Sequence, residues 1–255
     1  MAPTTEKVSS EPQEADGWVK VRRRKGCRPA KKASAKKSSR SKGPHESTIS
    51  LEQVKQEHDR FASEWKSSPA YAQVQEILSG HTASNRVTKA ICFGLGSFDP
   101  PDGHYARKRQ SHTQLAAFLA IVEHLQSKAN NRIRCIFQEP IFTTVDKAFI
   151  TSLGHEVVES PVGFQLVDSE TLTFGIHLYK DVCSKIVATC FPAIYIGTSY
   201  EFWNDLLECY RIENMGRMEE LEQTSVRVKF PDNKSETVFE PTVIYWRQKD
   251  QSQDR

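Results

Sequence analysis

The sequence predicts an α/β protein, with a three-layer, mostly parallel, Rossmann-like sheet that has helices on both faces. Short apolar runs of strand length recur along the chain, and helical patterns of about ten residues or more separate them. Of the 255 residues, 38% are hydrophobic, which is enough for the core of one large domain. We expect this domain over residues 47–247, after a disordered basic tail (1–46) and before a disordered C-terminus (248–255).

Two helices are predicted ahead of the sheet. After Ser50, apolar and aromatic residues recur every three or four positions, as they do on the buried face of a helix: Leu51, Val54, His58, Phe61 and Trp65. A second helix is predicted from Ser68, a typical N-cap residue, with Pro69 at its first position. Gly80 is a natural stop for this helix.

The strands and helices then alternate. Strands are predicted at 90–95 and 132–138, with a helix over 107–127 between them, in which Ser111 and Gln114 have the spacing of a capping box. A helix over 144–153 follows and ends at Gly154. Further strands are predicted at 155–160, 172–178 and 193–197, with helices at 179–189 and 199–210. The segments 225–230 and 242–246 are interpreted as an edge hairpin around the turn "PDNKS".

The cysteines predict neither a disulfide framework nor a zinc site. None of the six forms a C-x-x-C pair, and most lie among apolar residues, where a free cysteine behaves as a small hydrophobe: Cys27, Cys92, Cys135, Cys183, Cys190 and Cys209. No metal or other cofactor is required by the sequence. The chain has no run of eighteen apolar residues, and we expect a soluble intracellular protein without a membrane partner.

The net charge of +3 hides two parts of opposite sign. Twelve Lys or Arg and no acid lie between Lys20 and Lys42, whereas residues 44–255 hold 22 bases and 28 acids. Three roles are open for the tail: a signal read by the nuclear import machinery, weak contact with nucleic-acid phosphates, or a solvated segment. We expect the protein in nucleus and cytoplasm, with protein partners. The acidic body argues against a dedicated nucleic-acid binder.

Candidate ligand-binding residues follow the predicted strands, because open parallel sheets bind ligands at the carboxyl ends of their strands. The first turn holds Gly94, Gly96 and Ser97, and its G-x-G spacing suits either a phosphate cradle or a plain turn. The third glycine of the dinucleotide fingerprint is absent, since Asp99 stands there. The sequence therefore leaves two interpretations of this turn, a phosphate cradle and a plain turn.

The later strand ends add further candidates. Glu139 lies where such folds keep an acid for ribose hydroxyls, although it is far from the glycines in sequence. His177 is a weak catalytic candidate as an acid or base, with a hydrogen-bonding loop histidine as the plainer alternative. After the fifth strand, the turn of Gly197, Thr198 and Ser199 either contacts a ligand or caps the next helix.

Five blocks in a fixed order resemble one family. They are "AICFGLGSF", "SHTQLAAFLAIVEHL", "IFQEPIFTTVDKAFITSLGHEVV", "FGIHLYKDV" and "AIYIGTSYEFW", with a looser echo in "FEPTVIYW". Together they are similar to the Sensitivity-to-Red-light-Reduced (SRR-like) domain over about half the chain. The sequence departs from that pattern by inserting "DPPDGHYARK" after the first turn, by Glu139 in place of Asp, and by "IHLYK" in place of a Pro-His-Cys-like turn.

The resemblance implies a regulatory protein in circadian, light or stress-related signalling, of a family without settled catalysis. Relatives are nuclear or cytoplasmic regulators. The alternative, which rests on the residues at the strand ends, is an enzyme or sensor that binds a nucleotide-like or S-adenosylmethionine-like ligand at the carboxyl edge. Whether the protein is an enzyme is left open at this point.

Overall fold

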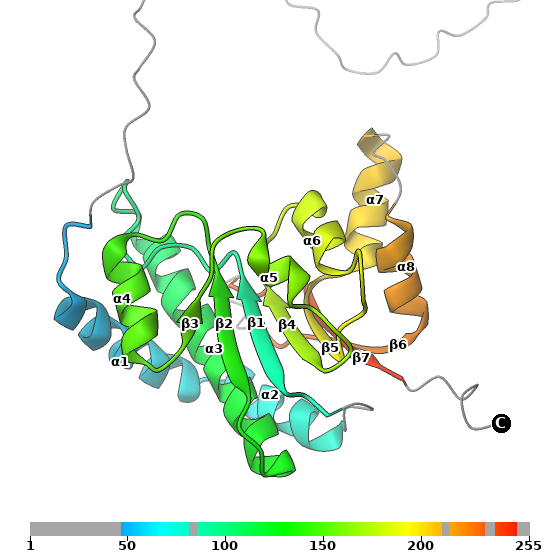
Figure 1. Ribbon diagram of the computed structural model, residues 1–255, viewed down its shortest axis with the longest axis horizontal. Helices are drawn as coiled ribbons and strands as arrows, with labels where there is room; N and C mark the ends of the chain where they lie inside the picture. The colour runs from blue at the N-terminus through cyan, green and yellow to red at the C-terminus, as the bar shows by residue number, and fades with distance from the viewer. Residues whose placement is uncertain (1–46, 82–85, 211–214, 233–237, 249–255) are drawn as a thin grey trace, which may run out of the picture. The chain divides into compact units, whose positions relative to one another are not determined.

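A computed structural model describes residues 47–81, 86–210, 215–232 and 238–248 (Figure 1). These residues belong to one compact unit, Lys42–Arg255. The predicted basic tail, and all but the first residue of the predicted C-terminal segment 248–255, lie outside the described residues. So does most of the "PDNKS" turn.

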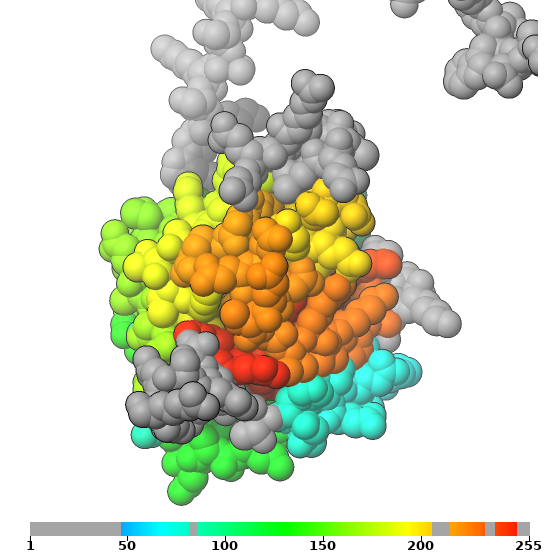
Figure 2. Space-filling model, turned by 90° about the vertical axis from the view of Figure 1, so that its right-hand side faces the viewer, coloured from blue at the N-terminus to red at the C-terminus, as the bar shows by residue number. Residues whose placement is uncertain are grey.

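The described residues form a seven-stranded mixed sheet, which confirms the predicted α/β class. Five strands are parallel, and β7 pairs antiparallel with both β5 and β6, so the predicted edge hairpin is also confirmed. In spatial order the strands are β3 (Glu156–Val157), β2 (Arg134–Gln138), β1 (Lys89–Phe93), β4 (Thr171–Gly175), β5 (Ile194–Thr198), β7 (Thr242–Arg247) and β6 (Ser225–Lys229). Figure 2 looks onto the side of the molecule where β6 and α8 (orange) lie.

Helices cover both faces of the sheet. Successive strand residues point to opposite sides, so that Cys92 packs in one hydrophobic cluster and Phe93 in the other. The first cluster includes residues of α1 (Leu51–Lys66), α2 (Pro69–Gly80), α3 (Tyr105–Ala129) and α4 (Thr144–Ser152). The second is covered by α5 (Val162–Gln165), α6 (Lys180–Ile186), α7 (Tyr200–Tyr210) and α8 (Gly216–Gln223).

Side-chain caps explain where several helices begin. Ser50 and Gln53 form a capping box at α1, which was not predicted from the sequence. Ser68 caps α2, as expected from the sequence. The capping box predicted at Ser111 is wrong. Helix α3 begins six residues earlier, at Tyr105, and the Ser111 hydroxyl donates to the carbonyl oxygen of Arg107 at 3.2 Å. A serine inside a helix commonly makes this bond to the preceding turn.

Helix α3 is covered on two sides. Every residue from Ser111 to Phe118 is buried, since the sheet packs on one side of the helix and α1 and α2 on the other. Val54 and Trp65 of α1 and Val74 of α2 lie in the same hydrophobic cluster as the strands. The two N-terminal helices are therefore part of the core.

The sheet has a topological switch point between β1 and β4. From β1 the chain proceeds outward to β2 and β3, and then returns to place β4 on the other side of β1. The carboxyl ends of β1 and β4 therefore border the position where open α/β sheets bind ligands. Strand β4 ends at Gly175, earlier than the predicted end at residue 178. His177 therefore follows the strand, as expected for a candidate at the carboxyl edge.

Candidate functional site

The first turn has the backbone of a tight glycine turn. Gly94 and Gly96 have φ angles of 66° and 82°, which other residues rarely adopt. A side chain on Gly94 would collide with Leu178, and one on Gly175, at the end of β4, would collide with the same leucine. Leu178 is buried. Its side chain thus occupies the space over both glycines at the switch point.

Glu139 is bonded to the first turn. One carboxylate oxygen accepts the Gly96 N–H at 2.9 Å, and the other accepts the Ile141 N–H at 3.0 Å. The two sequence candidates Gly96 and Glu139 are therefore brought together, as the carboxyl-edge rule predicts. In this arrangement the carboxylate oxygens hold backbone groups of the protein itself.

His177 connects three segments of the chain. Its Nδ1 lies 2.6 Å from Nε2 of Gln110 in α3, and its Nε2 lies 2.7 Å from the carbonyl oxygen of Glu240, just before β7. Because a carbonyl oxygen only accepts, Nε2 carries the proton, and Nδ1 accepts from the Gln110 amide. Each ring nitrogen thus has one hydrogen-bond partner. The backbone of His177 has a φ of 54°, unusual for a residue other than glycine.

Ser97 points to a carboxylate that the sequence did not single out. Asp146 has no exposed surface. Its oxygens accept the Ser97 hydroxyl at 2.7 Å, the Phe98 N–H at 3.0 Å and the Thr143 N–H at 2.8 Å. It ties the loop after β1 to the start of α4. The one sequence signal for this role is the T-x-x-D spacing of Thr143 and Asp146, which forms a capping box in the structure.

Asp99 anchors the start of the described chain. It accepts hydrogen bonds from the Ser47 hydroxyl at 2.9 Å and from the Thr48 N–H at 2.8 Å. Burial acts to raise the pKa of this carboxyl, but the bonds from Thr48 and Ser47 and the charge of Lys108 hold the pKa below its usual value. The residue that replaces the third fingerprint glycine thus has a structural bonding role.

The turn after β5 caps a helix, which was one of its two predicted roles. The Ser199 hydroxyl accepts the Phe202 N–H at 3.1 Å in the first turn of α7. The Thr198 carbonyl oxygen accepts from the Tyr195 hydroxyl at 3.4 Å. Gly197 lies beside Gly175 in the sheet, where a side chain would press on the Gly175 carbonyl oxygen and on Tyr195.

Metal-binding clusters and membrane-spanning helices are both absent from the described residues. Among them, no group of three or more His, Cys, Asp or Glu is placed to hold a metal ion. Within the same residues, no helix is both long and apolar enough to cross a membrane.

Comparisons with known proteins give one family. A comparison with curated proteins gives no significant match. Among solved structures, the crystal structure of Thermoplasma acidophilum 1320 matches 74% of this chain and 94% of its own, at 12% identity and a TM-score of 0.36. A likeness this weak carries no argument about the fold or the site. The model of the SRR1 domain matches residues 74–246. More than half of the chain lies in that match, and the protein therefore belongs to the SRR1 domain family.

Proposed function

We propose that this protein is a regulator that acts through contacts with partner proteins, in circadian, light or stress-related signalling. One observation carries the proposal: at the switch point, the chain's own atoms engage the groups that a ligand would need. Leu178 lies over Gly94 and Gly175, Glu139 holds backbone N–H groups, and both ring nitrogens of His177 are bonded. These contacts give the residues a structural purpose that requires no bound substrate.

A second candidate is a nucleotide-like or S-adenosylmethionine-like ligand at the same edge. It is favoured by the lack of side chains on Gly94 and Gly175, since this leaves a space that the Leu178 side chain fills. Leu178 lies in the turn after β4, next to the exposed Tyr179. Displacement of this turn would open the switch point to a ligand.

Replacing His177 with asparagine separates the two candidates. Asparagine tolerates a positive φ but does not titrate near neutral pH. In cells that lack the gene, we expect His177→Asn to restore transcript rhythm, stress response and growth when its abundance is matched to that of the unaltered protein. Exposed His104→Asn is the matched control. Loss of rescue by His177→Asn alone, at equal abundance, would refute the regulator proposal and favour the ligand site.

The basic tail enters the proposal as an import signal. Removing residues 1–46 deletes all twelve basic residues between Lys20 and Lys42. We expect a fluorescent fusion of residues 47–255 to lose its nuclear fraction, while the full chain distributes between nucleus and cytoplasm. A control fusion keeps the tail but has Ser34, Ser38 and Ser39 replaced by alanine, so that its charge is unchanged. An unaltered nuclear fraction without the tail would refute the import role.

A further inference from the structure

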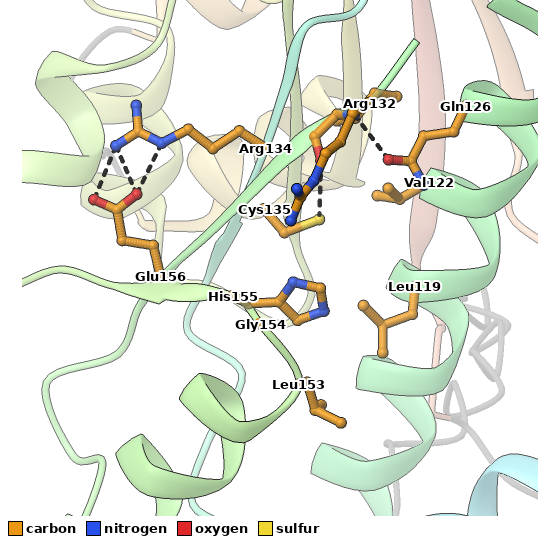
Figure 3. A pocket seen from close by; sticks show the side chains of 11 residues that line it. Leu119, Val122, Gln126, Arg132, Arg134, Cys135, Leu153, Gly154, His155 and Glu156 are labelled. Atoms are coloured by element: carbon orange, nitrogen blue, oxygen red, sulfur yellow. Dashed lines mark hydrogen bonds and ion pairs between the residues drawn. The ribbon is translucent and has the colours of Figure 1, made fainter. Parts of the chain in front are cut away.

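A hollow of about 580 Å³ (Figure 3) is lined by residues of α3, β2 and β3. It lies at the amino edge of the sheet, opposite the switch point. It is bordered by the amino ends of β2 and β3, by the end of α4 and by the C-terminal half of α3. The sequence patterns point to the other end of the strands, because open parallel sheets bind ligands at their carboxyl ends. Its lining residues are separate from the candidate site described above.

Part of the wall is apolar and part is fixed by bonded polar groups. Leu119 and Val122 of α3 contribute apolar surface. Arg134 of β2 and Glu156 of β3 form a bidentate ion pair, with two N–O distances of 2.8 Å. The side-chain Oε1 of Gln126 accepts the Ile133 N–H at 2.8 Å. These contacts hold the polar side chains of the wall in fixed positions.

Three ionisable side chains also line the hollow, namely those of Arg132, Cys135 and His155. Among the described residues, Arg132 has no ion pair or hydrogen bond from its side chain, and the ring nitrogens of His155 have no hydrogen-bond partner. Burial lowers the pKa of His155, and the charge of Arg132 lowers it further. Burial raises the pKa of the Cys135 thiol to about 12, against the opposing effect of Arg132. At neutral pH, the arginine is therefore the charged member of the three.

We infer that this hollow binds a small amphipathic anion, with an apolar body against α3 and a carboxylate or phosphate group on Arg132. A guanidinium is weakly hydrated and matches both anions with two parallel hydrogen bonds. The neutral His155 ring adds one N–H donor beside it. Ligand pockets typically combine apolar walls with a few convergent polar groups, as this hollow does.

Helix α3 connects the hollow with the switch point, which suggests a role in regulation. The hollow lies at the amino edge, while the switch point lies at the carboxyl edge, and α3 reaches both. Its residue Gln110 is bonded to His177, and its later residues Leu119 and Val122 line the hollow. An anion bound here would contact no residue of the switch point. It would contact α3, the helix whose Gln110 is bonded to His177. The inference does not depend on either function proposed above.

Calorimetric titration of the full chain tests this inference with hexanoate, octanoate, octyl phosphate and 1-octanol as probes. We expect octanoate or octyl phosphate to bind once per chain, and the tighter of the two identifies the preferred anion. Octanoate should bind more tightly than hexanoate by about fourfold for each added methylene. Binding of 1-octanol as tight as that of both anions would overturn the inference, as would the absence of binding by all four probes.

A matched pair of variants separates the hollow from general attraction to the basic chain. Arg132→Gln should weaken anion binding by about tenfold or more, because a charge-assisted contact is lost. Arg132 is exposed, so the variant is expected to fold. Arg107→Gln makes the same charge change near the other edge and should leave binding unchanged. Equal weakening by both variants, or by neither, would overturn the inference.

Discussion

Replacement of Asp146 by alanine is expected to lower the free energy of unfolding by about 4 kcal/mol. The carboxylate is fully buried and accepts hydrogen bonds from Ser97, Phe98 and Thr143. Its removal leaves these buried donors without an acceptor, and each such donor costs about 1–3 kcal/mol. Guanidinium-induced unfolding followed by circular dichroism measures the loss.

The control for Asp146→Ala is Asp181→Ala. Asp181 also lies in the first turn of a helix, α6, but it is exposed. Substitutions at exposed positions of this kind usually change the free energy of unfolding by less than about 0.5 kcal/mol. If the two variants unfold at the same denaturant concentration, the Asp146 network does not hold the β1 loop to α4.

Between pH 6.5 and 5.5 the protein is expected to lose about 2 kcal/mol of its free energy of unfolding through His58 and His112. Burial lowers the pKa of these histidines from 6.5 to about 4 and about 3, respectively. In the unfolded chain both rings accept protons near pH 6.5, whereas the folded state resists protonation until the pH is much lower. Their contribution to stability is thus present above pH 6.5 and is lost as the pH falls toward the folded-state values.

The surroundings of His112 explain why it stays neutral. Its ring packs against Phe61 and Phe98, with centroids 5.2 and 4.8 Å away. After burial, the positive charges of neighbouring groups also lower its pKa, namely protonated His58, Lys108 and Arg60. The nearest carboxylate oxygen is that of Glu57, which lies 3.8 Å from Nε2. In the described structure neither ring nitrogen has a hydrogen-bond partner.

The variant His112→Leu tests whether the histidine pair causes this loss of stability at acid pH. Leucine is close to histidine in size and removes no hydrogen bond, so we expect the loss between pH 6.5 and 5.5 to fall by about half, to about 1 kcal/mol. Exposed His104→Leu should leave the loss unchanged. Denaturant unfolding at several pH values measures both. An unchanged pH dependence in His112→Leu would show that the histidine pair is not its cause.

The order and type of the main elements could be predicted because their signals are local. Ser50 and Ser68 mark helix starts, Gly154 follows the end of α4, and apolar runs mark the central strands. Two short helices, α5 and α8, were not predicted. The former has only four residues, and the latter, "GRMEELEQ", buries just Met218 and Leu221. Neither gives the extended apolar pattern on which the prediction relied.

The candidate site was predictable in its location but not in its contacts. The carboxyl-edge rule brought Gly96 and Glu139 together correctly. The partners of His177 are 67 and 63 residues away in sequence, and no local pattern identifies them. Leu178 was overlooked because an apolar residue after a polar candidate suggests core packing. Asp146 was overlooked because an acid in the first turn of a helix is usually exposed.

The double cover of α3 determines where this domain can be divided. The family match begins at residue 74, within α2, yet the helix before it supplies Val54, Phe61 and Trp65 to the interior. A chain cut at the family boundary would expose the outer face of α3 to water. A piece of this protein that is to fold on its own should therefore start at or before the Ser50 cap of α1, more than twenty residues ahead of the part that identifies its family.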